Sequence, residues 1–202
     1  MERVLIVSRT QMKNGVCVGG ISVDSGKLIR LHNDRGGNLS VDAPYQIGEV
    51  WKMDVEYPWN PRPNPHSEDR STTPISLAGK VGMQGIVDFI HNNLAVLNVA
   101  QGPLSNTFDE TLQVSGNKCY VGKNDIPEFS TQFWIADKPL YHKISYNKDF
   151  YFYKGLLIPF VGFQQIVDEI PQGTVIRLSL ANWWDNGCGE ERCYLQLSGW
   201  YL

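Results

Sequence analysis

A short loop brings together three side chains that could do chemistry. His66, Glu68 and Asp69 follow Pro65, so an imidazole lies close to two carboxylates in the sequence. Such a group could bind a divalent cation or transfer protons. Acid–base catalysis would need a second convergent group, and His142 is distant along the chain. The loop is therefore a candidate ligand site that only tertiary contacts could complete.

The same loop also has a purely structural interpretation. Its carboxylates could cap turns or pair with the neighbouring Arg62 or Arg70. The sequence contains no nucleophile-elbow, zinc-protease, dinucleotide-binding or phosphate-loop motif. We therefore expect no catalytic residues and no cofactor, and a binding protein in preference to an enzyme.

The cysteine pattern indicates a reducing compartment and not a metal centre. Four cysteines stand at positions 17, 119, 188 and 193, and their spacing matches no paired metal half-site. Cys188 and Cys193 are close enough for a hairpin disulfide or half of a zinc site, but no second ligand pair accompanies them. We expect four reduced thiols and no bound metal.

One predicted strand of the second half carries a single arginine. Alternation along residues 175–180 places Arg177 on the same face as Ser179, opposite to the apolar isoleucine and leucines. From this partly polar face, Arg177 could contact a phosphate of a nucleic acid. It could equally pair with an acid of the chain, such as Glu190 or Glu191.

Aromatic residues make up 11% of the chain, more than a core of this size needs. Trp183 and Trp184 are adjacent at the end of a predicted strand, so one ring can enter the core while the other stacks on a base. Trp200 and Tyr201 form a second such pair. Trp59 lies in a proline-rich loop, where there is less core to enter, and the nearby Arg62 is a further candidate for nucleic-acid contact. We predict stacking by Trp59 and by one of Trp183 or Trp184, with core packing as the alternative for each.

Charge is unevenly distributed. The net charge of −3 and the pI of 5.8 disfavour a protein that binds duplex DNA mainly by neutralising phosphates. Residues 1–35 nevertheless contain six Lys or Arg against three acids, a local excess of three positive charges. The candidates for phosphate contacts there are Arg9, Lys13, Arg30 and His32, although a charge cluster is often only a solvated face.

Short alternating segments predict a mainly β protein. The expected strands are 3–12, 16–23, 27–32, 45–57, 118–123, 132–137, 150–153, 156–160, 174–184 and 192–200. Five prolines in residues 58–74 predict a loop there. Apolar spacing in residues 85–99 predicts a helix. The amino terminus has no signal-peptide pattern and no apolar run is long enough for a bilayer, so we expect a cytoplasmic protein without a membrane role.

Three parts of the sequence carry a family resemblance. The opening VSRTQMKNGVCVGGISVDSGKLIRL, the loop around His66 and the ending RLSLANWW with ERCYLQLSGWYL resemble the prokaryotic dual OB-containing family. The resemblance implies two successive small OB-like barrels, which we place at residues 1–110, with the proline-rich loop and the helical insertion, and at 111–202. It also implies nucleic-acid binding, with single strands favoured, and a gene encoded near phage-defence or DNA-processing genes.

Two other functions remain open. The exposed rings could anchor protein partners in such an assembly, in which case they would form a continuous apolar patch. A nucleic-acid-binding surface would instead alternate rings with Arg and Lys. A nucleotide sensor or enzyme centred on His66, Glu68 and Asp69 would need a deep pocket.

Overall fold

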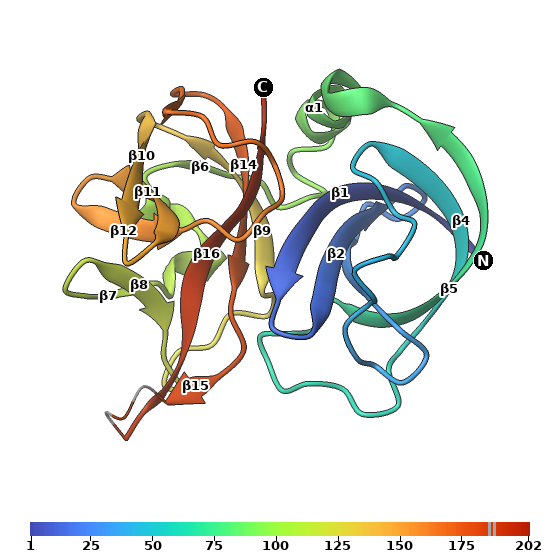
Figure 1. Ribbon diagram of the computed structural model, residues 1–202, viewed down its shortest axis with the longest axis horizontal. Helices are drawn as coiled ribbons and strands as arrows, with labels where there is room; N and C mark the ends of the chain where they lie inside the picture. The colour runs from blue at the N-terminus through green and yellow to red at the C-terminus, as the bar shows by residue number, and fades with distance from the viewer. Residues whose placement is uncertain (186, 188) are drawn as a thin grey trace. The chain divides into compact units, whose positions relative to one another are not determined.

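The computed structural model describes every residue except Asn186 and Cys188, and the chain forms two compact units (Figure 1). The first unit contains residues 1–63, 67–99 and 201–202, and the second contains residues 64–66 and 100–200. The expectation of a reduced thiol at Cys188 falls outside the described residues. The division at residue 110 into separate folding domains stays a prediction.

The first unit consists of five strands followed by one helix. They are β1 (Glu2–Met12), β2 (Gly15–Ser22), β3 (Leu28–His32), β4 (Glu49–Glu56), β5 (Asp69–Lys80) and α1 (Gly82–Asn92). The strands close into a barrel in the order β1-β2-β3-β5-β4, in which β3 and β5 are parallel. Alternation fills this barrel with apolar side chains from every second position, such as Val16 and Val18 of β2 and Ile29 and Leu31 of β3.

Strand β1 closes this barrel by pairing with both β2 and β4. Its residues Glu2–Leu5 pair with β4, and its residues from Val4 to Met12 pair with β2. The register with β2 shifts between Ile6 and Ser8, which is a β-bulge. A bulge bends a strand and increases its twist, and this lets one strand serve both neighbours.

The prediction of a loop across residues 58–74 is wrong for its last part. Strand β5 begins at Asp69 and includes Pro74, which lies opposite Met53 of β4 next to a register shift. Proline lacks the N–H that a central strand needs, but a bulge tolerates it. In addition, β3 pairs with β5 only at Asp69–Ser71, so Pro74 faces no β3 partner.

The helix is real but shorter than predicted. It occupies Gly82–Asn92 and buries Ile86 and Ile90. Asn93 ends it, because its backbone N–H bonds the carbonyl of Ile90 and its side-chain amide bonds the carbonyl of Phe89 at 2.7 Å. Asparagine side chains compete in this way with the helical hydrogen bonds.

The second unit contains shorter elements. They are β6 (Ala100–Gly102), η1 (Leu104–Asn106), η2 (Phe108–Glu110), β7 (Gln113–Ser115), β8 (Lys118–Val121), β9 (Thr131–Ala136), β10 (Leu140–Ser145), β11 (Lys148–Tyr153), β12 (Leu156–Pro159), β13 (Glu169–Ile170), β14 (Val175–Leu180), β15 (Trp184–Asp185) and β16 (Glu191–Tyr201). Strand β10 was not predicted from the sequence. Apart from the buried Leu140, the residues of β10 are partly or fully exposed. The segment therefore shows little of the alternation that marks a half-buried strand.

The strands of the second unit form two sheets that adjoin each other. One sheet has the order β12-β11-β10-β13, and the other has the order β6-β9-β14-β16-β8-β7, with β15 beside β16. Only residues 137–139 separate β9 from β10, and a parallel bridge joins Phe160, next to β12, to Leu197 of β16. Followed in a circle, the neighbours are β9/β10, β11, β12, β16 and β14.

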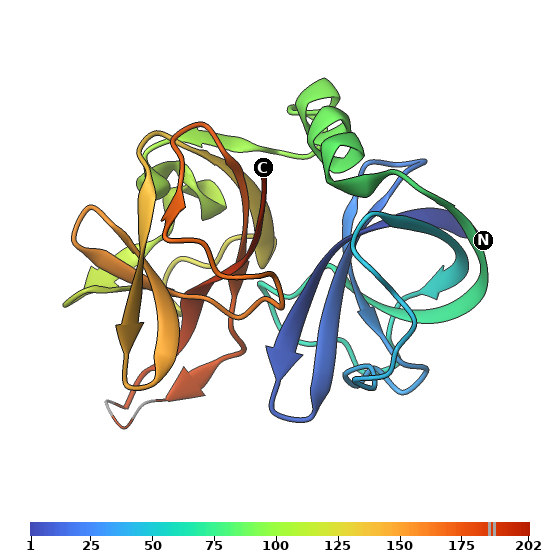
Figure 2. The same cartoon turned by 45° about the horizontal axis from the view of Figure 1, so that its top comes forward.

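This circle repeats the strand order of the first barrel. If β9 and β10 are counted as one interrupted strand, each unit has the order first, second, third, fifth, fourth, with the third and fifth strands parallel. Each unit is a curled set of strands (Figure 2). The predicted fold class, mainly β with two such units and one helix between them in the sequence, is confirmed.

Candidate nucleic-acid interface

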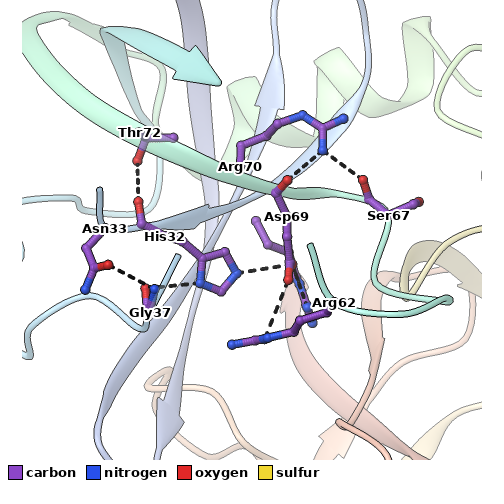
Figure 3. A network of polar contacts seen from close by, with 9 residues as sticks. His32, Asn33, Gly37, Arg62, Ser67, Asp69, Arg70 and Thr72 are labelled. Atoms are coloured by element: carbon purple, nitrogen blue, oxygen red, sulfur yellow. Dashed lines mark hydrogen bonds and ion pairs between the residues drawn. The ribbon is translucent and has the colours of Figure 1, made fainter. Parts of the chain in front are cut away.

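A buried ion cluster occupies the outer face of β3. The parallel register places Arg30 directly opposite Asp69 of β5. The Nε and Nη2 atoms of Arg30 each lie 2.6 Å from Oδ1 of Asp69. His32, two residues further along β3, points its Nε2 at the same oxygen from 3.1 Å (Figure 3). The alternation that sends Ile29 and Leu31 into the barrel therefore sends a charged pair to the opposite face.

The loop after β3 fixes the His32 ring. Its Nδ1 lies 3.1 Å from the carbonyl oxygen of Gly37, and the side chain of Asn33 accepts the Gly37 N–H at 2.9 Å (Figure 3). The hydroxyl of Thr72 donates to the backbone carbonyl of His32. Both ring nitrogens thus face oxygen atoms that can accept hydrogen bonds.

Asp69 also receives a contact from the proline-rich loop. The Nη1 of Arg62 lies 3.6 Å from Oδ2 of Asp69 (Figure 3). Burial by itself would raise the pKa of Asp69, but the hydrogen bond from His32 and the charge of Arg30 outweigh it and lower the pKa to about 2. The carboxylate is therefore ionised and shared by three basic side chains.

The cluster corrects the placement expected for two basic residues. Arg30 is 6% exposed and His32 is 1% exposed, so neither lies on an open basic face. The physical reason is the parallel β3–β5 pairing, which supplies a carboxylate partner from a residue 39 positions away. The predicted phosphate contacts from these two residues therefore do not match the described surface.

The other nucleic-acid-binding candidates of the first unit lie at its surface or near it. Arg9 donates from its two Nη atoms to the backbone carbonyls of Tyr45 and Val41, at 3.0 and 2.9 Å. It thereby fastens the loop before β4 to β1. Lys13 is exposed in the turn between β1 and β2, and Trp59 is 99% exposed. The nucleic-acid contacts of Arg9, Lys13, Arg62 and Trp59 stay predictions.

The surface around β8, β15 and β16 brings aromatic rings and cations together. We name it the aromatic–cation cluster, and its members are Tyr120, Lys123, Trp183, Trp184, Arg192 and Tyr194. The Nζ of Lys123 lies 3.9 Å from the centre of the Trp183 ring, and the guanidinium carbon of Arg192 lies 4.1 Å from the centre of the Tyr120 ring. The ring centres of Trp184 and Tyr194 are 6.1 Å apart.

The two adjacent tryptophans have different environments. Trp183 packs against the core of the second unit and donates its indole N–H to the carbonyl of Asn64 at 2.7 Å. Trp184 lies on β15 opposite Arg192 and is 60% exposed. In contrast, Trp200 and Tyr201 are both buried, so the expectation of one available ring in that pair is wrong. Trp184 is the ring of these four that can meet a ligand.

A family model described as dual OB-containing domain matches residues 2–200. The chain belongs to the dual OB-containing domain family. A search of the curated proteins and a search of the solved structures each found no match. Membership of an OB-containing family suggests nucleic-acid binding in general.

The three residues of the alternative ligand site of this dual OB protein are all buried. His66 is buried and belongs to the second unit, whereas Glu68 and Asp69 are buried and belong to the first. The backbone carbonyl of Glu68 accepts the N–H of Arg30 at 2.9 Å. Among the described residues, no three His, Cys, Asp or Glu side chains are placed to hold a metal ion. A ligand at His66, Glu68 and Asp69 stays a prediction.

Arg177 is a buried residue of the second unit. It lies opposite Phe133 of β9 and is nearly inaccessible to solvent. The acids proposed as its partners pair elsewhere, since Glu190 contacts Arg192 at 3.2 Å and Glu191 contacts Lys123 at 3.0 Å. The predicted pairing of Arg177 with an acid of the chain stays a prediction.

Sequence reasoning missed four members of the aromatic–cation cluster. Tyr120 and Tyr194 lie on strands β8 and β16, which are paired in the structure but far apart in the chain. Lys123 and Arg192 reach the rings from the same two segments. Only alternation within each strand is visible in the sequence, and the β8–β16 pairing that combines the four is not.

No described helix is long and apolar enough to cross a membrane.

Proposed function

We propose that this dual OB protein binds nucleic acid, with a preference for single strands, and performs no chemistry on it. The aromatic–cation cluster carries the proposal. Lys123 and Arg192 lie against two of its rings. A third ring, Trp184, is largely exposed. Single-strand binding surfaces combine rings that stack on bases with cations that follow the backbone.

The arrangement favours nucleic acid over a protein partner as the ligand. Rings that anchor a protein partner would be expected within a continuous apolar patch, because the centre of a protein–protein interface is apolar and fully buried. In the cluster, cations instead lie against the faces of Trp183 and Tyr120. The acids Glu190 and Glu191 partly neutralise these cations, so modest affinity is expected. A cytoplasmic role in a prokaryotic defence or DNA-processing system is a prediction that rests on the family resemblance alone.

The proposal is tested by fluorescence anisotropy with labelled single-stranded DNA, single-stranded RNA and duplex DNA at two salt concentrations. We expect single strands to bind more tightly than duplex. Trp184→Ala and Trp59→Ala should each weaken binding by about 1–3 kcal/mol with little change in salt dependence, because stacking releases few counterions. Lys13→Ala should weaken binding and flatten the salt dependence, because a phosphate contact releases about one counterion.

The matched control is Val114→Ala, which removes an exposed apolar side chain of the second unit outside the cluster. It should bind as the wild type does. If folded wild-type protein binds no single strand and no duplex, the nucleic-acid proposal fails, and an adaptor that anchors protein partners takes its place.

A further inference from the structure

The barrel of the first unit is closed at one end and open at the other. At the closed end, Tyr45 is buried, and Leu39 and Ala43 of the same loop pack against the barrel core. The end of β4 that lies away from this loop borders a cavity of about 130 Å³, which we name the mouth cavity. Its lining includes Glu2, Lys27, Ile29, Val55, Glu56 and Arg70. The mouth of a β-barrel is a frequent place for a small-molecule site.

Strand alternation directs charged residues into the mouth cavity. Glu2 lies two residues before Val4, whose side chain is in the barrel core. Arg70 of β5 lies opposite Leu31 of β3, another core residue. Residues two apart on a strand, and residues directly opposite in a ladder, share one face of a sheet. Glu2 and Arg70 therefore continue the inner face of the barrel, whereas the ion cluster around Asp69 lies on the outer face.

The mouth cavity has an apolar floor and a charged rim. Ile29 is 3% exposed and Val55 packs against the barrel core, so these two side chains form the floor. The charged residues of the rim are Glu2, Lys27, Glu56 and Arg70. Two acids and two bases give this rim a net charge of zero. A ligand with charge of one sign only, such as phosphate or a metal ion, would meet like charges there.

Arg70 is held in position at the rim. Its Nη1 donates to the backbone carbonyls of Ser67 and Asp69, at 2.8 and 2.6 Å (Figure 3). Its guanidinium carbon lies 4.2 Å from the centre of the Tyr57 ring. These contacts do not use the donors on Nε and Nη2, and a guanidinium can hold a carboxylate through two parallel hydrogen bonds. Arg70 is therefore a preorganised partner for a carboxylate.

The other charges of the rim are not paired with one another. Among the described residues, none forms an ion pair with Glu2, Lys27 or Glu56. In contrast, Arg3, the neighbour of Glu2 in the chain, pairs with Asp24. The two glutamates can thus accept hydrogen bonds from an ammonium group, and Lys27 can support Arg70 in binding a carboxylate.

We propose that the mouth cavity binds a free α-amino acid with a short aliphatic side chain. The carboxylate of the ligand pairs with Arg70 and Lys27, and its ammonium group pairs with Glu2 and Glu56. Its side chain lies on the apolar floor. The site does not depend on the proposed function, because it lies inside the barrel wall and uses no residue of the aromatic–cation cluster.

The size of the mouth cavity sets the size of the ligand. A cavity of about 150 Å³ is large enough for benzene, so a cavity of about 130 Å³ that is open on one side has room for about six to eight non-hydrogen atoms. Alanine and valine are of this size. A nucleoside, which combines a base with a sugar ring, is too large.

The first experiment uses the unaltered, isotope-labelled protein. L-valine is added and the backbone amide resonances are followed by heteronuclear NMR. We expect saturable shifts at the amides of Glu2, Lys27, Val55 and Arg70. Two analogues each keep only one of the charges, 3-methylbutanoate the carboxylate and isobutylamine the ammonium. Each should bind at least about tenfold more weakly, because one set of charged hydrogen bonds is lost.

The second experiment measures L-valine binding to variants by the same shifts. Lys27→Met and Glu2→Gln should each weaken binding by about tenfold to about 150-fold, because each removes a charged partner of the ligand. The matched control is Lys52→Met, which should bind as the wild type does. Lys52 is an exposed lysine of the same barrel, and it alternates on β4 with the core residue Met53.

The outcomes decide the proposal without depending on the folding of a variant. Saturable shifts at the mouth cavity with L-valine, and much weaker binding of both analogues, support it. It is overturned if L-valine and L-alanine cause no saturable shift there, or if 3-methylbutanoate or inorganic phosphate binds as tightly as L-valine. Folded Lys27→Met and Glu2→Gln variants that bind L-valine like the wild type would also overturn it. None of these results bears on nucleic-acid binding, which is measured separately.

Discussion

Asp69 has an unusual number of basic partners for one carboxylate. Arg30 and His32 share its Oδ1, and Arg62 approaches its Oδ2. Removing one partner from a buried ion pair leaves an uncompensated charge, which is strongly destabilising. This cluster ties β3 to the start of β5 and to the proline-rich loop. We therefore expect these residues to determine the stability of the first barrel.

The lowered pKa of Asp69 predicts a loss of stability in acid. Its pKa in the folded protein is about 2, below the ordinary value of 3.8. The carboxylate therefore stabilises the fold fully above about pH 4 and loses this contribution as the pH falls toward 2. A depression of this size corresponds to about 2 to 3 kcal/mol. Urea unfolding at a series of pH values measures it.

Two variants give this measurement its controls. Asp69→Asn should be less stable at neutral pH and should lose less additional stability between pH 4 and 2 than the wild type. Asp24→Asn, which removes a surface partner of Arg3, should keep most of the acid loss. Identical acid profiles for wild type and Asp69→Asn would show that other carboxylates cause the effect.

Two tight turns set the register of the sheet formed by β10, β11 and β12. The β10–β11 turn places Tyr146 and Asn147 at φ of 50° and 57°, and the β11–β12 turn places Lys154 and Gly155 at 45° and 90°. Two central residues with positive φ match the twist of a hairpin. Because a slip of one residue would turn every side chain to the opposite face, these turns decide that Phe150 and Phe152 lie outside.

Gly155→Ala should destabilise the protein by about 1 kcal/mol, because a side chain disfavours the left-handed region. An added Cβ at Gly155 would meet no atom within 4 Å, so the cost comes from the backbone alone. Thermal unfolding measures it. Gly79→Ala in β5 is the matched control, since that position also has free space but no positive φ. Equal stability of Gly155→Ala and wild type would contradict the role of this turn.

At the scale of the whole molecule, the end of the chain returns to the first unit. Tyr201 belongs to that unit, and its hydroxyl donates to the carbonyl of Val7 at 2.6 Å. Val7 is the residue at the bulge of β1, where the pairing with β2 is interrupted. The hydroxyl thus supplies a donor to a buried carbonyl at an irregular point of the ladder.

Tyr201→Phe should destabilise the first unit by about 1–3 kcal/mol, because it leaves this carbonyl without the hydroxyl donor. The free energy of unfolding in urea is the measurement. Tyr57→Phe, at an exposed tyrosine, should change it little. If both variants unfold at the same urea concentration, the bond to Val7 does not contribute to stability.

Local patterns in the sequence were sufficient for the β-rich class, the helix between the halves and the family. These features depend on alternation, on turn residues and on recognisable segments, all of which are visible within short windows. The same windows placed Trp184 at the end of a strand and Trp59 in a loop. They also contained the alternation of Phe150 and Phe152, although nothing in them says which face of the strand is covered.

The tertiary structure decided the features that depend on distant pairing. The partnership of Arg30 with Asp69 exists because β3 and β5 are parallel neighbours across 39 positions, and no local pattern records that register. The same pairing makes a strand of a segment that contains Pro74. The repeated strand order of the two units is likewise a property of hydrogen bonding between strands, which many unrelated side chains can satisfy. This is why the two halves share a fold without a visible repeat in sequence.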